Sequence, residues 1–166
     1  MKILKLALIS VGIFFFFFAG IAFLIPSSIR ISKVVDISCT PAALMEQISE
    51  PANWKNWHPG LETAPFLYVN GKVEGYILQN NQKQFLIVSD KKEKEIISKL
   101  KFNKKEIISG WRIVTVNDAG SIGLQWYMNF ELGWLPWEKF ASLFFENIYG
   151  SQMEKGLNRL KAILET

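Results

Sequence analysis

Very few side chains in this chain of 166 residues have the chemistry for catalysis or metal binding. The one His and the one Cys, His58 and Cys39, exclude sites built from several histidines or thiolates, and a disulfide scaffold. A general base needs a partner that orients it, and the residues around His58 supply no such pattern. Because His58–Pro59 follows a short helical segment, we interpret His58 as a capping or turn residue. The sequence has no phosphate-binding glycine loop, nucleophile elbow or telling pair of carboxylates, so it predicts no catalytic residue, metal or cofactor.

A few polar side chains could position and polarise a carbonyl group of a bound substrate: Arg112, Tyr68, Tyr76 and Tyr149. Arg112 lies in a predicted strand, and its neighbours by alternation, Gly110 and Val114, are small and apolar. An inward Arg112 would need a carboxylate from the protein or the ligand, because a buried unpaired charge is costly. We therefore favour a solvent-facing Arg112 and leave the inward orientation open.

Aromatic residues make up 14% of the chain, which favours an apolar cavity. Trp54 and Trp57 are three residues apart on a short helical segment and so share nearly one face. They either form the rim of a cavity or fasten that segment to a sheet. Each aromatic candidate is also a candidate core residue. The candidate cavity residues are Trp54, Trp57, Tyr76, Trp111, Arg112, Trp126, Met128, Phe130, Phe144 and Tyr149.

The N-terminal segment Leu6–Ile25 is apolar over 20 consecutive residues. A helix of that length spans about 30 Å, the thickness of the hydrocarbon core of a bilayer. A cleaved signal peptide is the alternative, with a weak small-residue site at Gly20–Ile21–Ala22. We expect a retained single-pass anchor over residues 1–26. Lys2 and Lys5 precede it, which predicts a cytoplasmic N-terminus and residues 27–166 on the outer face.

Residues 27–166 carry the pattern of one α+β domain. A strand over Ser28–Ile37 precedes a helix over Pro41–Ser49, with Thr40 as N-cap, and a second short helical turn over 51–57. Turn signals, of which Asn70–Gly71 is the strongest, then separate six strands in an antiparallel meander. The strands are expected over 66–69, 73–79, 84–89, 94–102, 107–116 and 121–131, and the other turns at 80–81, 90–92, 103–105 and 117–120.

A long C-terminal helix closes the predicted domain, with an interruption at Gly150 as an option. Phe140, Phe144 and Ile148 form one stripe at helical spacing, and Leu157, Leu160 and Leu164 form a second. The predicted fold is therefore a curved seven-stranded antiparallel sheet wrapped around this helix, with two short helices after the first strand. The space between sheet and helix is the expected ligand site.

Several motifs in this order resemble the START-like helix-grip superfamily, also called SRPBCC, and in particular its polyketide cyclase/dehydrase and lipid transport group. Residues 51–59 (PANWKNWHP) are similar to the Trp-x-x-Trp-x-Pro signature of that group, with Glu50 in place of its acidic residue. Residues 125–130 and 149–161 are similar to its last strand and to the end of its C-terminal helix. The resemblance covers about residues 28–165. It implies a cavity for lipids, sterols, polyketides or other apolar molecules.

These observations favour a membrane-anchored domain that binds, carries or senses an apolar small molecule or lipid. A polyketide cyclase or dehydratase is one alternative, and a structural interaction domain with a collapsed cavity is another. The lysine-rich stretch 83–105 is interpreted as a solvated sheet face, with contact to anionic lipid headgroups as the second interpretation. The net charge of +4 is small and no recognition helix is present, so nucleic acid is not an expected partner.

Overall fold

The structure is a computed structural model that describes residues 2–78, 84–102, 105–116 and 121–166. Its helical elements are α1 (Lys2–Leu24), α2 (Pro41–Ser49), the 3₁₀ helix η1 (Pro51–Asn56), α3 (Pro136–Ser142), the π-helical turn η2 (Glu146–Gly150) and α4 (Ser151–Leu164). Its strands are β1 (Ser28–Ser38), β2 (Phe66–Val69), β3 (Lys72–Ile77), β4 (Gln84–Lys92), β5 (Glu95–Phe102), β6 (Lys105–Val116) and β7 (Ser121–Glu131).

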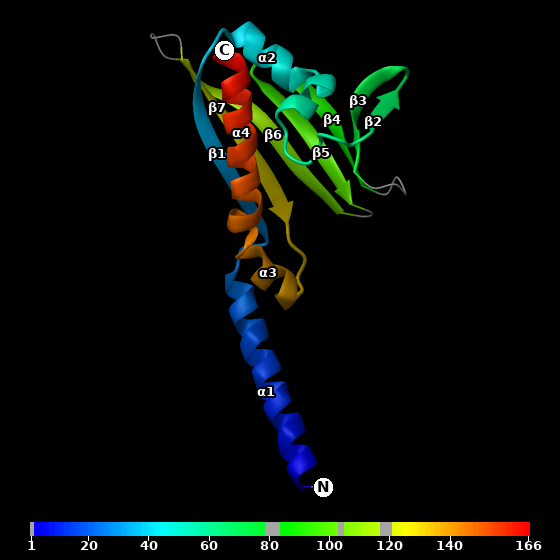
Figure 1. Ribbon diagram of the computed structural model, residues 1–166. Coiled ribbons are helices and arrows are strands. Elements are labelled where there is room, and N and C mark those ends of the chain that lie inside the picture. The colour runs from blue at the N-terminus through cyan, green and yellow to red at the C-terminus, as the bar shows by residue number, and fades with distance from the viewer. Residues whose placement is uncertain (1, 79–83, 103–104, 117–120) are drawn as a thin grey trace.

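The seven strands form one antiparallel sheet in the order β1-β7-β6-β5-β4-β3-β2. Strands β2 to β7 follow one another as a meander, and β1 closes the sheet beside β7, with Ser28 opposite Glu131 and Ser38 opposite Ser121. Register shifts in β4 and β6 mark bulges, which bend the strands that contain them. Helix α4 lies along the sheet, and α2 and η1 cover one end of the same face (Figure 1). The predicted α+β helix-grip fold is confirmed.

Local sequence signals explain the ends of several elements. The Thr40 hydroxyl accepts a hydrogen bond from the Ala43 amide at 3.3 Å, and Pro41 occupies the first turn of α2, as expected. Asn70 and Gly71 both have positive φ angles, 52° and 78°, which is the geometry of the predicted two-residue hairpin turn. The predicted turns at 80–81, 103–104 and 117–120 lie outside the described residues.

One predicted turn is in the wrong place. We expected β4 to end before residues 90–92, but the strand continues to Lys92, which pairs with Glu95. The bulge between Val88 and Asp90 absorbs one residue and lets the ladder continue. The turn therefore falls at residues 93–94.

The predicted C-terminal helix is confirmed, with an interruption, but its first part is irregular. Met153, Leu157 and Leu160 of α4 are buried in the core, so the second predicted stripe faces the sheet. Phe144 and Ile148 of the first stripe are exposed instead, because α3 is a separate short helix and the π-helical turn η2 intervenes. The interruption therefore spans the residues before Gly150 rather than Gly150 alone.

Helix α1 extends away from the sheet, and α3 lies beside its C-terminal end (Figure 1). Over Ile3–Leu24 it is long and apolar enough to cross a membrane, and nearly all of its side chains are exposed. The Phe18 and Phe140 rings meet edge to face, with centroids 6.0 Å apart. The buried Lys139 ammonium donates a hydrogen bond to the Ile25 carbonyl at 2.8 Å. Contacts between α1 and α3 therefore join the apolar helix to the rest of the fold.

Candidate functional site

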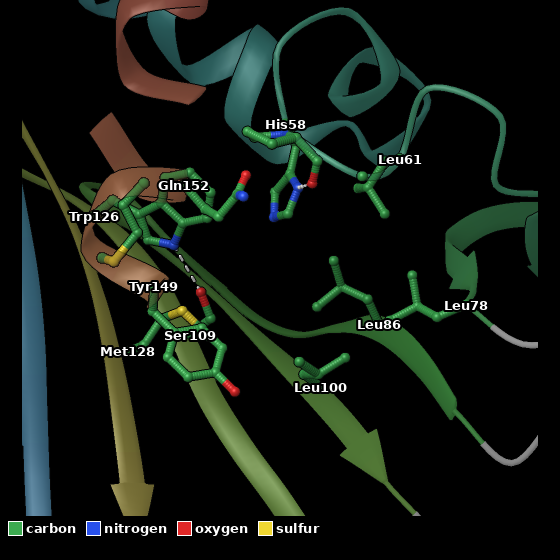
Figure 2. Close-up of a pocket in the computed structure, with 13 residues that line it drawn as sticks. His58, Leu61, Leu78, Leu86, Leu100, Ser109, Trp126, Met128, Tyr149 and Gln152 are labelled. Carbon is green, nitrogen blue, oxygen red and sulfur yellow. Dashed lines mark hydrogen bonds between the residues drawn. The ribbon is translucent and has the colours of Figure 1, made fainter. Parts of the chain in front are cut away.

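An apolar pocket of about 350 Å³ lies between the sheet, the start of α4 and the loop after η1 (Figure 2). Its apolar wall comes mainly from leucine and methionine side chains of β4, β5, β7, α4 and the segment after β3. Its polar groups are few. The lining residues are His58, Pro59, Gly60, Leu61, Leu78, Leu86, Leu100, Ser109, Trp126, Met128, Tyr149, Gln152 and Met153. A pocket of this size and polarity is typical of small-molecule sites.

Four tryptophans support the pocket at the end covered by η1. Trp54, Trp57 and Trp111 are fully buried, and Trp111 lies 4.8 Å from Trp54 and 5.5 Å from Trp57, measured between ring centroids. Trp57 meets Trp126 edge to face at 6.0 Å. Trp54 donates its indole hydrogen to the Ile48 carbonyl at 3.0 Å. These contacts fasten η1 to the sheet and fix the loop that follows it.

The floor of the pocket holds a short chain of hydrogen bonds. The Trp126 indole donates to the Ser109 hydroxyl at 2.9 Å, which orients the ring along the sheet. The Ser98 hydroxyl donates to the Ser109 carbonyl at 3.2 Å, so β5 and β6 are tied at the same level. The Ser109 oxygen is an acceptor in this arrangement and keeps its own hydrogen to donate.

His58 forms part of the wall, where the chain turns after η1. Its ring lies 4.8 Å from the Trp126 ring and 5.7 Å from the Trp57 ring, between centroids. Its Nδ1 lies 3.0 Å from the Pro59 carbonyl oxygen. Burial among these rings lowers the pKa of His58 to about 4, so the ring is neutral at physiological pH. The sequence predicts a capping or turn residue at this position. His58 does lie in a turn, but its ring also contributes to the pocket.

Apart from Arg112, the candidate cavity residues divide into four groups. Trp126, Met128 and Tyr149 line the pocket. The buried Phe130 lines a neighbouring hollow of about 310 Å³, which Tyr149 also lines. Phe144 is 62% exposed and lines neither. The remaining aromatic candidates are fully buried behind the pocket wall: Trp54, Trp57, Tyr76 and Trp111.

Arg112 belongs to the opposite face of the sheet. Its guanidinium makes an ion pair with Glu95, with Nη2 2.6 Å from Oε1, and the Tyr127 hydroxyl donates to the same oxygen at 2.9 Å. Arg112 therefore faces outward, as favoured from the sequence, and Glu95 is its carboxylate partner. Tyr76 also serves the scaffold, because its hydroxyl donates to the Pro51 carbonyl at 2.6 Å.

Sequence reasoning missed the leucines of the pocket, which look like any core residue in a strand. Leu86 and Leu100 are opposite each other on the paired strands β4 and β5, and Leu78 directly follows β3, so only the pairing of the strands brings them together. Gln152 was missed as well, at the start of α4. The sequence does contain one signal for Gln152: it is a polar residue next to the buried face of a helix. Among the described residues, no group of three or more His, Cys, Asp or Glu side chains could hold a metal ion.

A curved antiparallel sheet that grips a C-terminal helix, with an apolar pocket between them, defines a START-like protein of the helix-grip class. The family model described as "Polyketide cyclase / dehydrase and lipid transport" matches residues 28–165. The chain therefore belongs to the polyketide cyclase/dehydrase and lipid transport family.

Solved structures agree on the fold at low sequence identity. A protein from Thermobifida fusca, solved by NMR, is 13% identical, with a TM-score of 0.60 over 82% of this chain and 91% of that one. XoxI from Bacillus cereus is 10% identical, with a TM-score of 0.57 over 81% and 94% of the two chains. The di-domain ARO/CYC BexL of the BE-7585A biosynthetic pathway is 11% identical, with a TM-score of 0.59 over 84% of this chain and 51% of BexL. A comparison with curated proteins finds no significant match.

Proposed function

We propose that this chain is a membrane-anchored domain that binds an apolar small molecule or lipid in the pocket between the sheet and α4. The observation that carries the proposal is the pocket itself, an apolar space of about 350 Å³ with a few polar groups in its wall. Burial of ligand surface would drive binding at about 25 cal/mol per Å². Membership of a family described by lipid transport supports the same conclusion.

Helix α1 is the proposed anchor, and residues 27–166 form the proposed binding domain. The tether would keep the pocket close to a bilayer, where apolar molecules concentrate. The lysines at the N-terminus support a cytoplasmic N-terminus and a domain on the outer face, as part of this proposal. The chain's one cysteine makes this orientation testable. In a Cys39→Ser background, Ala52→Cys adds one thiol at an exposed site of the domain. A membrane-impermeant maleimide should label it in intact cells, whereas labelling only after lysis would reverse the orientation.

A cyclase or dehydratase is the second candidate, because the pocket contains hydroxyl, imidazole and amide groups and the fold is that of the ARO/CYC BexL. Of the four residues that the sequence offered for polarising a carbonyl, Tyr149 lines the pocket, whereas Arg112, Tyr68 and Tyr76 do not. Binding without turnover is therefore the first choice.

Native mass spectrometry of the full-length chain, released gently from its own membrane, tests the proposal. We expect a stoichiometric apolar adduct. Leu100→Trp should fill the pocket and remove the adduct, while Val114→Trp, at an exposed position of β6, should retain it. If none of the three proteins carries an adduct, and none takes up added 1-dodecanol or phosphatidylcholine, the binding function is overturned.

A further inference from the structure

The pocket has polar groups in its wall but no charged ones among the described residues that line it. The polar side chains are His58, Ser109, Tyr149 and Gln152. A carboxylate or phosphate group buried here would have no cationic partner, and an unpaired buried charge is very costly. The wall therefore disfavours an anionic head and accommodates an uncharged one.

The hydrogen bond of His58 fixes which ring nitrogen carries the hydrogen. Nδ1 lies 3.0 Å from the Pro59 carbonyl oxygen, and a carbonyl oxygen can only accept. Nδ1 must therefore be the donor, and in the neutral ring Nε2 is an acceptor without a hydrogen. Figure 2 shows the other ring nitrogen of His58 directed into the pocket, on the side of the ring away from the dashed hydrogen bond. Among the hydrogen bonds of the described residues, none reaches Nε2. The pocket thus presents the free lone pair of His58 Nε2 to its ligand as an acceptor.

We propose that the pocket selects an uncharged ligand with an apolar body and one hydroxyl group, and that this hydroxyl donates its hydrogen to Nε2 of His58. The ligand class is a long-chain or polycyclic alcohol. Ser109 and Gln152 are positioned as further partners, because both line the same pocket as His58. This inference rests on the proposed binding function and names its ligand class.

The experiment uses three probes with the same twelve-carbon chain: 1-dodecanol, dodecane and dodecanoate. The full-length chain is ¹⁵N-labelled and placed in phosphatidylcholine nanodiscs. Because His58 is the one histidine, its ring nitrogens give a single pair of imidazole signals. We expect Nδ1 to carry the hydrogen, and 1-dodecanol to shift the Nε2 signal where dodecane does not. The alcohol should bind about fivefold more tightly than the alkane, the value of one net hydrogen bond.

His58→Phe is the matched variant, and dodecane shows whether its pocket is intact. We expect dodecane to bind this variant normally and the preference for the alcohol to disappear. The quantity compared is the affinity for 1-dodecanol divided by the affinity for dodecane, in the natural chain and in His58→Phe. Because each probe partitions into lipid equally in both samples, this comparison cancels the partitioning. An equal ratio in both proteins, tighter binding of dodecanoate, or a hydrogen on Nε2 overturns the alcohol proposal. Failure of all three probes to bind overturns the binding function itself.

A second, independent observation concerns the surface around α3. Large apolar side chains are exposed there on neighbouring turns: Trp134 (80%), Trp137 (63%), Leu143 (61%), Phe144 (62%) and Ile148 (56%). We call these five residues the α3 surface. Exposed apolar side chains gathered in one region mark a contact with a partner or a membrane.

The contacts of α3 with α1 favour a membrane as the partner of the α3 surface. Phe140 meets Phe18, six residues before the end of α1, which corresponds to about 9 Å along a helix axis. Ala22 is buried, and Lys139 donates to the Ile25 carbonyl just after α1 ends. If α1 spans a bilayer, α3 must lie at the level where hydrocarbon gives way to headgroups. Tryptophan is enriched at that level.

We infer that the α3 surface is seated in the headgroup region of the bilayer that α1 crosses, with Trp134 and Trp137 as its interfacial side chains. This inference rests on the proposed anchor. Full-length chain in vesicles of phosphatidylcholine brominated near the headgroup tests it, because bromine quenches nearby tryptophan fluorescence. We expect quenching in the natural chain and a loss of most of it in the Trp134→Phe/Trp137→Phe variant. The other four tryptophans are buried in the domain.

An alkaline carbonate wash separates the two hypotheses. A chain washed off the vesicles has no spanning anchor, and the proposed anchoring is then wrong. A chain that resists the wash but shows the same quenching before and after the double substitution has an anchor, and the α3 surface is then not in the interface.

Discussion

Gly156 of α4 packs directly against Trp126 of β7. A Cβ atom at position 156 would lie 2.6 Å from Cζ3 of Trp126 and 2.9 Å from Cδ of Pro59. The close approach of α4 to the sheet therefore depends on the absence of a side chain at this position. Trp126 and Pro59 both line the pocket, so the same contact also sets the position of its wall.

Gly156→Ala should destabilise the fold by about 1–3 kcal/mol, because the added methyl group overpacks the contact with Trp126. Ordinarily the same change in a helix stabilises by about 1 kcal/mol. Urea unfolding of the full-length chain, followed by tryptophan fluorescence, measures the free energy of unfolding. Asn158→Ala, two residues on at an exposed position of α4, is the control and should change it little. A gain in stability for Gly156→Ala would contradict the observed packing.

Acid should destabilise the protein through His58. The folded pKa is about 4 and the ordinary value is 6.5, so the unfolded chain binds the proton more readily. Stability is therefore complete above pH 6.5 and falls as the pH drops from 6.5 towards 4. By linkage the loss between pH 7 and pH 5 is about 2 kcal/mol. Glu62 is the one acidic group that raises this pKa, and it is paired with Arg159 at 2.6 Å.

His58→Phe removes the titrating group and so should remove this part of the pH dependence. The measurement is the free energy of unfolding of both proteins at pH 5 and pH 7. The free energy of unfolding of the natural chain, relative to that of His58→Phe, should fall by about 2 kcal/mol from pH 7 to pH 5. An unchanged difference would show that the ring is not desolvated. An NMR titration of the single histidine then reads its pKa directly.

The outer face of the sheet has its own polar cluster, made of Glu95, Arg112 and Tyr127. Burial alone would raise the pKa of Glu95, but hydrogen bonds from Tyr127 and Arg112 outweigh it and hold that pKa below the ordinary value. Tyr127 lies across Gly110, where an added Cβ would be 2.5 Å from its ring. The cluster therefore ties β5, β6 and β7 together on the side away from the pocket.

Arg112→Met should destabilise the fold by about 1 kcal/mol, a value reduced because Arg112 is 45% exposed and its ion pair is screened. In that variant Glu95 keeps the hydrogen bond from Tyr127 and the ion pair with Lys92, whose Nζ lies 4.0 Å from Oε2. A double-mutant cycle with Glu95→Gln measures the coupling between the two side chains. Ligand affinity should be unchanged in all three variants, because this cluster faces away from the pocket. A large loss of binding in Arg112→Met would instead support an inward role for the guanidinium.

The fold could be predicted because local signals and long-range pairing agree. Asn70–Gly71 fixes a hairpin, Thr40–Pro41 starts a helix, and the alternation along 121–131 fixes one buried face of β7. The C-terminal region could not be predicted in full, because Phe140, Phe144 and Ile148 have the spacing of a core stripe. Only the contact of Phe140 with Phe18 of α1 and the exposure of Phe144 and Ile148 show that they do not face the sheet.

The candidate site was harder to predict for a similar reason. Aromatic residues on alternating positions are equally suited to a pocket wall and to the core behind it. Trp111 and Trp126 are opposite each other on β6 and β7, yet only Trp126 lines the pocket. The difference comes from η1, which covers Trp111 through Trp54 and Trp57. No periodicity within one strand contains that information.

Tyr149 forms a partition between the pocket and the neighbouring hollow, because its side chain lines both. The two spaces have volumes of about 350 and 310 Å³. Phe145 lines only the second, and its ring centroid lies 5.4 Å from that of Tyr149. The tyrosine ring should therefore limit the length of ligand that the pocket accepts.

Tyr149→Ala should join the two spaces and admit a longer chain. We expect the affinity for 1-octadecanol relative to 1-dodecanol to rise at least tenfold, since each additional buried CH₂ contributes up to about 0.8 kcal/mol. Isothermal titration of the full-length chain in nanodiscs gives both affinities. Phe145→Ala is the control, because it enlarges the second hollow but leaves the Tyr149 ring in place. Its affinity for 1-octadecanol relative to 1-dodecanol should therefore stay near that of the natural chain. The same ratio in Tyr149→Ala and the natural chain would show that the ring does not limit ligand length.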